Sequence, residues 1–261
     1  MANDLERAWR RAATLAPEHA LALPFAGERV AVFGTGLASG VARAYAALRE
    51  DTTRTMTDPP IPDDLSPRPY DRSLLLSAAG DEPALVEVVE WLRSEAILAI
   101  AVGVPEGSPV DELAGVTVPL AAIDGPGGYE AAYALTAFAV LRRHQAGETG
   151  GADARRAIRA GLPDVSGVRR WAFVGRRWTL GLAESAARAF RRRGAAAVAG
   201  TPAELASGDL GAFEPTTLVW RFDGGDPLEG DPDEGGPAVR RATLDPAAEL
   251  VLALRVAETL G

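Results

Sequence analysis

Residues 29–40, Arg29-Val-Ala-Val-Phe-Gly-Thr-Gly-Leu-Ala-Ser-Gly40, decide the fold class of this chain. The run from Arg29 to Phe33 is short, apolar and bounded by glycines, which is typical of a strand buried on both faces. A glycine-rich turn at 34–40 follows, and helical spacing continues through Leu48. A buried strand that passes through such a turn into a helix predicts the opening of a parallel α/β sheet.

The same alternation of strands and helices continues along the chain on both sides of a glycine-rich break. Before the break we expect a first helix at 4–16, a proline-rich surface loop at 57–69, strands at 74–76, 97–102 and 116–120, and helices at 83–94 and 128–144. After it we expect helices at 153–160, 179–193 and 245–260, strands at 171–174, 195–199 and 217–222, and a solvated loop at 223–237. The break itself contains glycines 147, 150 and 151. The sequence therefore predicts two α/β subdomains, residues 1–147 and a shortened 152–261.

Composition excludes several kinds of chemistry. The 261 residues include no cysteine and no lysine, so thiolate catalysis, cysteine zinc sites, Schiff bases and a P-loop lysine are ruled out. Only His19 and His144 are present, and we interpret them as a loop residue and a helix-end residue, so no metal site and no cofactor are expected. The net charge of −9 disfavours a nucleic-acid partner.

The sequence also bears on location. The apolar stretch 131–141 is too short to cross a bilayer, and the first residues have no basic region of the kind that precedes a signal peptide. Together with the absence of cysteine, these features lead us to expect a cytoplasmic protein without a membrane partner.

Two turns follow strand ends and are the candidate ligand-binding segments. In a doubly wound sheet, ligands bind where strand carboxyl ends meet helix amino ends. The first turn offers Gly34, Thr35, Gly36 and Ser39, and the second offers Ser77 and Gly80. A hydroxyl and free N–H groups at a helix start favour a phosphate, although both turns are also compatible with ordinary tight or capping turns.

Acidic residues beside these turns leave two questions open. Asp81 and Glu82 follow the second turn and would compete with a phosphate. The first turn nearly matches a dinucleotide fingerprint, with Asp58 about where an acid would contact the ribose, but Ser39 stands in place of its third glycine. A nicotinamide-dependent oxidoreductase is therefore a weak alternative.

Both turns resemble those of the sugar isomerase (SIS) domain family, here in tandem, and most of all the small bifunctional phosphoglucose/phosphomannose isomerases. The resemblance implies two SIS-like subdomains of flavodoxin type. The family's Gly-x-Gly-Gly-Ser-Gly turn is matched by Gly34-Thr-Gly-Leu-Ala-Ser39, with Ala38 at the serine position. Its Ser-x-Ser-Gly-x-Thr phosphate loop is matched by Ser77-Ala-Ala-Gly-Asp-Glu82, in which Ala79 and Glu82 replace the second serine and the threonine.

The catalytic motifs of the family are reduced in this chain. The resemblance places the family's arginine at Gly127, after Pro126, and its base near Arg191, with Glu184 as the nearest carboxylate. The ring-opening histidine of the Pro-Glu-Leu-x-His motif corresponds to Ser207, while the glutamate is kept as Glu204. Glu204 and Glu184 are thus the candidate catalytic residues, and a serine cannot replace imidazole at neutral pH.

These observations leave three functions open. We favour a degenerate SIS-domain protein that binds a phosphosugar (a hexose 6-phosphate) or a protein partner with little or no catalysis. An active glucose- and mannose-6-phosphate isomerase is the first alternative, and the oxidoreductase is the weaker one. Arg176 and Arg177 follow a strand and are further candidates for phosphate binding. The resemblance and the apolar helix 128–144 also lead us to expect a homodimer.

Overall fold

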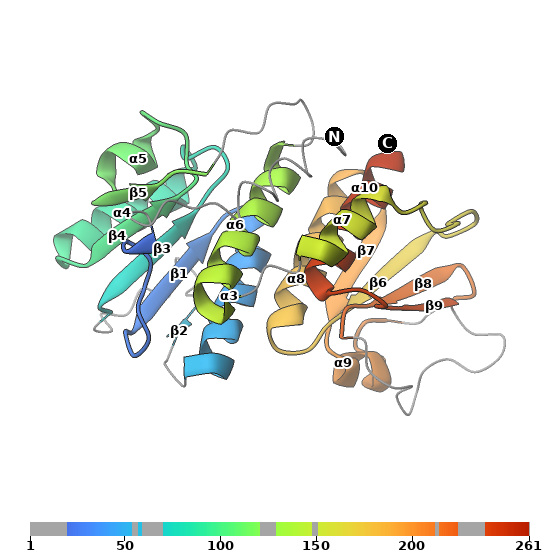
Figure 1. The fold of residues 1–261 in the computed structure, drawn as a ribbon. Coiled ribbons are helices and arrows are strands. Elements are labelled where there is room, and N and C mark those ends of the chain that lie inside the picture. Colours follow the sequence, from blue (N-terminus) through green and yellow to red (C-terminus); the bar gives the residue numbers. More distant parts are fainter. Residues whose placement is uncertain are drawn as a thin grey trace. The chain divides into compact units, whose positions relative to one another are not determined.

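The computed structural model describes residues 20–53, 57–58, 70–120, 129–147, 151–211, 214–223 and 238–260. The chain divides into two compact units, unit 1 over Asn3–Thr149 and unit 2 over Gly150–Gly261. Figure 1 labels the elements of each unit. The expected helix at 4–16 lies outside the described residues, as do residues 224–237 of the loop expected at 223–237.

Unit 1 is a parallel sheet with helices on both faces. Its strands are β1 (Val30–Gly34), β2 (Thr57–Asp58), β3 (Arg72–Leu76), β4 (Leu98–Val102) and β5 (Val116–Val118), in the order β2-β1-β3-β4-β5. Its helices are α3 (Ala38–Thr53), α4 (Pro83–Ser94), α5 (Pro109–Leu113) and α6 (Tyr129–Ala146). The strand order reverses at β1 and β3, which defines the switch point of a flavodoxin-type sheet.

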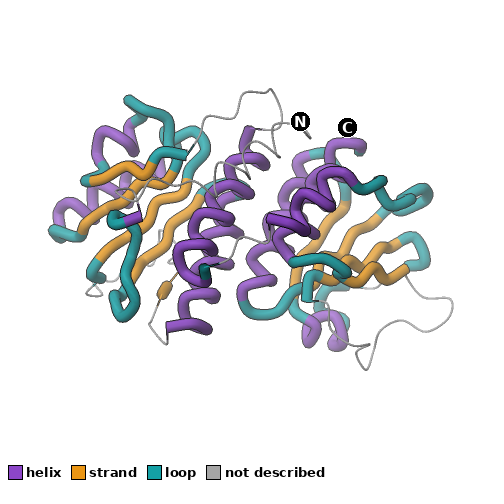
Figure 2. Tube along the Cα trace, in the orientation of Figure 1, coloured by secondary structure: helices purple, strands orange, loops and turns teal. Residues whose placement is uncertain are grey.

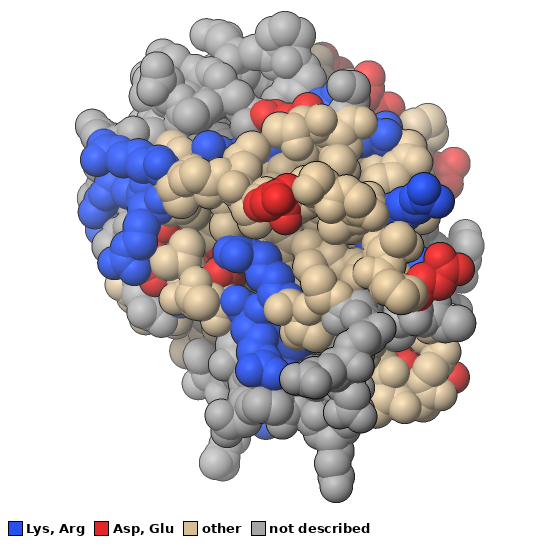
Figure 3. Space-filling view, turned by 90° about the vertical axis from the view of Figure 1, so that its right-hand side faces the viewer, with Lys and Arg blue, Asp and Glu red and all other residues tan. Residues whose placement is uncertain are grey.

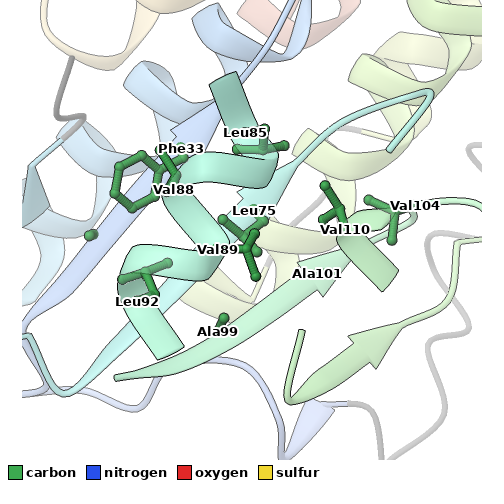
Figure 4. Packing of buried hydrophobic residues seen from close by; sticks show 11 residues of the cluster. Phe33, Leu75, Leu85, Val88, Val89, Leu92, Ala99, Ala101, Val104 and Val110 are labelled. Carbon is green, nitrogen blue, oxygen red and sulfur yellow. The ribbon is translucent and has the colours of Figure 1, made fainter. Parts of the chain in front are cut away.

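The core of unit 1 follows from the apolar strands predicted above. Helices α4 and α5 cover one face, where a buried cluster joins Phe33, Leu75, Val89 and Leu92 (Figure 4). Helices α3 and α6 pack against each other on the other face (Figure 1). The sheet is therefore buried on both sides, as continuous apolar strands require.

Unit 2 repeats the arrangement with four strands. These are β6 (Arg170–Val174), β7 (Ala196–Gly200), β8 (Thr217–Arg221) and β9 (Ala238–Arg241), all parallel and in the order β7-β6-β8-β9. The helices are α7 (Gly151–Arg159), α8 (Trp178–Arg192), α9 (Pro202–Ser207) and α10 (Pro246–Thr259). Figure 2 shows the strands of each unit running side by side between helices.

Aromatic side chains fill one face of the second sheet. Trp171 and Phe173 lie two residues apart on β6 and both face α8. The ring centroid of Phe190, on α8, lies 4.5 Å from that of Trp171 and 4.9 Å from that of Phe173. The residues between them on β6, Ala172 and Val174, face the smaller cluster that includes Leu205 of α9. This alternation is the period of two expected of a strand that is covered on both faces.

These elements confirm the prediction of an α/β fold with two parallel sheets, the second being shorter. In unit 1, two elements differ from expectation. Residues 57–58 of the predicted loop form β2, because Thr57 and Asp58 pair with Val30 and Ala31 of β1. A helix that was not expected, α5, begins where Ser108 accepts a hydrogen bond from the amide of Asp111.

Candidate functional site

The switch point of unit 1 brings the two predicted ligand turns together. Gly34 and Leu76 are paired at the carboxyl ends of β1 and β3, and the Thr35 amide donates to the Leu76 carbonyl at 3.1 Å. Thr35 therefore begins the turn after β1 directly beside Ser77, which begins the turn after β3. This is the crevice in which open α/β sheets bind ligands.

The glycines of these turns are required by close packing. A Cβ on Gly34 would lie 2.5 Å from the carbonyl oxygen of Ala38, so the turn closes only with glycine. Gly80 has φ +72°, and a Cβ there would lie 2.4 Å from the Ser108 hydroxyl. The Gly80 carbonyl also accepts from the amide of Val110 at 3.0 Å. The second turn is therefore fixed against the start of α5.

A carboxylate sits between the two turns. The Thr35 hydroxyl donates to Oε1 of Glu82 at 2.7 Å, and the Ser77 hydroxyl donates to Oε2 of the same carboxylate at 2.5 Å. Ser77 is fully buried and also accepts from the Gly80 amide at 2.6 Å. Glu82 is the N-cap residue of α4, but its side chain caps no amide of that helix. Two hydroxyls from two strand ends thus converge on one anion.

A second carboxylate, that of Glu130, lies at the start of α3. Oε1 of Glu130, from the first turn of α6, accepts from the Leu37 amide at 2.7 Å, just before α3 begins. Pro83 at the start of α4 has no N–H to offer. Several groups that would hold a phosphate at this edge therefore already serve carboxylates of unit 1.

Ser39, the third hydroxyl predicted at this edge, is hydrogen-bonded within its own turn. Its hydroxyl donates to the Gly36 carbonyl at 3.0 Å, within its own turn. The structure thus brings Thr35, Ser77 and Gly80 together around Glu82 and gives Ser39 a partner inside the turn.

The switch point of unit 2 is an ion cluster. Arg176 follows β6, Arg221 ends β8, and Asp223 comes two residues later. Nε of Arg176 lies 3.3 Å from Oδ2 of Asp223, and the fully buried Arg221 donates to both carboxylate oxygens at 3.1 Å. Arg176 is thus already paired. We did not predict Asp223 or Arg221. The available signal is that both lie at the carboxyl end of β8, the strand that pairs with β6.

Arg177 adopts a backbone conformation that glycine normally takes. Its φ is +49° and its ψ −125° at the N-cap of α8. Gly36, with φ +54°, holds the same place after β1, two residues beyond Gly34 as Arg177 is beyond Gly175. A Cβ on Gly175 would lie 2.5 Å from the Thr179 carbonyl oxygen, as one on Gly34 would from Ala38. The two turns are therefore structural equivalents, and unit 2 places an exposed arginine where unit 1 has glycine.

Exposed arginines are common on the surface of unit 2. Figure 3 views the side on which β8 and β9 lie in Figure 1, and arginines gather there in separate patches with acidic side chains nearby. Such a mixed surface is typical of solvated ion pairs.

Glu204 is the third helical residue of α9 and forms a capping box with the N-cap residue Thr201. Its Oε2 accepts from the Thr201 amide at 2.6 Å and from the Thr201 hydroxyl at 2.9 Å, while the Glu204 amide donates back to that hydroxyl. This reciprocal capping box starts α9 at the carboxyl end of β7. Ser207, in the place of the family's histidine, is exposed and donates to Asp209. Glu204 therefore has a structural task at this edge, and its catalytic role stays a prediction.

The other candidates for acid–base chemistry lie apart from this edge or hold structural bonds. Arg191 donates to the carbonyl of Ala197, near the amino end of β7, so the position expected for the base lies at the opposite edge of the sheet. Glu184 is half-buried in the middle of α8. Nε2 of His144 lies 3.0 Å from the Pro24 carbonyl oxygen.

The backbone position of Asp58 speaks against a dinucleotide site. Asp58 pairs with Ala31 of β1. Ala31 lies three residues before Gly34, the last residue of that strand. At about 3.3 Å per residue, that is roughly 10 Å from the carboxyl edge. A ribose-binding acid is expected at that edge.

The described residues contain no group of three or more His, Cys, Asp or Glu side chains arranged to hold a metal ion. In the same part of the chain, the helices are too short or too polar to cross a membrane.

Solved structures share this fold over nearly the whole chain. Glucosamine-6-phosphate deaminase from Thermotoga maritima matches with a TM-score of 0.72 and 13% identity, covering 99% of this chain and 92% of the other. Tagatose-6-phosphate ketose/aldose isomerase from Escherichia coli matches with 0.71 and 14%, covering 99% and 93%. The C-terminal domain of glucosamine-fructose-6-phosphate aminotransferase from Francisella tularensis matches with 0.67 and 11%, covering 98% and 93%.

The chain is therefore structurally similar to SIS-domain phosphosugar proteins and has the tandem SIS-like fold. No family model and no curated protein matches the sequence. Identities this low establish the fold alone.

Proposed function

We propose that this chain is a SIS-fold protein that binds a hexose 6-phosphate at the switch point of unit 1 and catalyses little or no isomerisation. The observation that carries the proposal is the pair of hydroxyls, Thr35 and Ser77, which converge on one anion in the crevice between β1 and β3. A phosphate accepts the same kind of hydrogen bond as the carboxylate that lies there now. We include Gly34, Gly36 and Gly80 because they let the backbone reach the ligand.

The absence of catalysis is argued from the acid–base groups. Moving a proton between C1 and C2 needs a positioned base, and ring opening needs a second group. Ser207 replaces the histidine, Arg191 lies at the opposite edge of the sheet, and Glu204 is engaged by Thr201. Each lost group removes about 10²–10⁴-fold in rate. Two losses raise the barrier by about 5 kcal/mol or more.

An active isomerase is the second candidate, and it depends on Glu184 or Glu204 serving as the base. A coupled assay that follows the conversion of fructose 6-phosphate to glucose 6-phosphate and mannose 6-phosphate distinguishes the two candidate functions. We expect no turnover above the assay background. Turnover above about 1 s⁻¹ that disappears in Glu204→Gln would establish the isomerase instead, because glutamine keeps the capping box.

Binding is tested by thermal shift with glucose, fructose and mannose 6-phosphates, with the unphosphorylated sugars as controls. A ligand that binds the folded state raises Tm by mass action. We expect a rise with the phosphates that Ser77→Asp abolishes, since a second carboxylate then lies beside that of Glu82. Ser39→Ala is the matched control, because its hydroxyl serves its own turn. Unchanged melting at millimolar ligand would remove the sugar-phosphate proposal.

Arg176 and Arg177 remain proposed contacts for an anionic ligand in unit 2. A homodimer and a cytoplasmic location are part of the same proposal. The resemblance to tandem SIS proteins favours the dimer, and the lack of cysteine is consistent with a reducing compartment.

A further inference from the structure

We infer that Glu82 is a specificity-determining residue: its carboxylate occupies the place of a ligand's phosphate between Thr35 and Ser77, so a phosphate binds only by displacing it. This inference rests on the proposed function and deepens it. It follows from the contacts of one side chain, which comes from the start of α4 and reaches both strand ends.

The hydrogen-bond inventory of the loop shows why the two anions exclude each other. A serine or threonine hydroxyl has one proton to donate. Thr35 donates its proton to Oε1 and Ser77 donates its proton to Oε2. With both protons committed to Glu82, neither hydroxyl can donate to an incoming phosphate. A phosphate needs donors, so it gains these hydroxyls only when Glu82 leaves.

Electrostatics act in the same direction. A carboxylate in the loop repels a phosphate that carries nearly two negative charges. Glu130 adds a second carboxylate at the start of α3 in the same unit, where it accepts from the Leu37 amide.

Glu82 is free to move without unfolding α4. It is half-buried, and its side chain makes no capping bond to the helix, while its backbone carbonyl accepts from the Leu85 and Val86 amides. Rotation of the side chain thus leaves the helix start intact. Ser77 keeps its bond from the Gly80 amide when Glu82 departs, so the loop retains its shape.

The test is a titration of the full chain with glucose 6-phosphate and with inorganic phosphate by isothermal calorimetry. Glu82→Ala frees both hydroxyls, and we expect its dissociation constant for each phosphate to be at least tenfold lower than that of the unmodified chain. Glu82→Gln keeps the shape but removes the charge, and we expect a smaller gain. Asp81→Ala is the matched control, since it removes one exposed negative charge from the adjacent residue. We expect it to change binding less than threefold.

Three results would overturn the inference: equal or weaker binding by Glu82→Ala and Glu82→Gln, an equal gain in Asp81→Ala, or no phosphate binding by any variant. Failure of the proposed function looks different. If the unmodified chain binds glucose 6-phosphate and Glu82→Ala gains nothing, the proposed function stands and this inference fails. If only the Glu82 variants bind phosphate, Glu82 has the inferred role and a hexose 6-phosphate is not the native ligand.

Discussion

At the scale of single residues, the comparison of Gly36 with Arg177 separates what the backbone needs from what the side chain does. Equivalent turns need a positive φ at this place, and glycine adopts it at little cost. A side chain in such a sparsely populated conformation costs about 1–3 kcal/mol. Such strain is often kept at functional positions. Arg177 is therefore a residue whose side chain is worth testing for ligand binding.

We predict that Arg177→Gly raises the free energy of unfolding by about 1–3 kcal/mol, measured by urea denaturation. Ala96→Gly is the matched control, because Ala96 is exposed, has φ +57° and directly follows the C-cap residue of α4, Glu95. It should give a gain of similar size. A loss of stability in Arg177→Gly beside a gain in Ala96→Gly would show that contacts of the arginine outweigh the strain.

At the scale of elements, one buried carboxylate ties helix α10 to the second sheet. Glu249 is fully buried and accepts from Nε1 of Trp220 on β8 at 3.1 Å and from the Thr243 amide at 3.0 Å. Arg240 of β9 lies 3.3 Å from the same carboxylate and over the Trp220 ring. A buried charge with this many donors is costly to remove, because its partners lose their acceptor.

We predict that Glu249→Ala lowers the free energy of unfolding by about 3–5 kcal/mol, measured by chemical denaturation. Glu258→Gln on the same helix is the control. Burial raises the pKa of Glu258, so loss of its charge relieves desolvation and changes stability little at neutral pH. Equal losses in the two variants would contradict the role given to the Glu249 network.

The short helix α5 supplies a prediction about pH. Two hydrogen bonds lower the pKa of Asp111 below its ordinary 3.8. The larger effect comes from the Thr117 hydroxyl and the smaller one from the Gly107 amide. Because the folded-state pKa is the lower one, this stabilisation is present above pH 3.8 and is lost as the pH falls through the folded value. Thr117→Val should raise the pKa of Asp111 toward its ordinary value, measured by NMR titration. An unchanged pKa would show that the hydroxyl does not set it.

The elements also show how far the sequence could be interpreted. Strands β1, β3 and β6 are apolar runs that end at turns, so their pattern predicted the sheets. Helix α5 was missed because it has only five residues, although Ser108 before Pro109 is a typical helix start. The Glu82 contact to Thr35 joins positions 47 residues apart, and no local pattern reports such a contact. The competition of Glu82 with phosphate was predictable, but its partners were not.

At the scale of the whole molecule, both units carry occupied switch points. Unit 1 places Glu82 between two hydroxyls, and unit 2 places Asp223 between two arginines. The fold thus keeps the geometry of a ligand edge twice, with internal partners in each. This arrangement fits weak, displaceable binding better than rapid turnover.

The proposed homodimer has its own measurement. Residues 132–142 of α6 are buried in the single chain, so the apolar character of this helix does not by itself require a second copy. The resemblance to tandem SIS proteins carries the prediction. Light scattering at micromolar concentration should give twice the mass of one chain, and a particle of one chain's mass would count against the dimer.

The central claim, binding without isomerisation, is tested most directly by phosphorus NMR of fructose 6-phosphate incubated with the protein. One spectrum followed over hours reports both properties, because exchange with bound ligand broadens the phosphate signal and isomerisation adds new signals. We predict a broadened fructose 6-phosphate line, sharpened again by Ser77→Asp, with no signal from glucose 6-phosphate or mannose 6-phosphate. New product signals would contradict the loss of catalysis, and a line as sharp as in buffer would contradict binding.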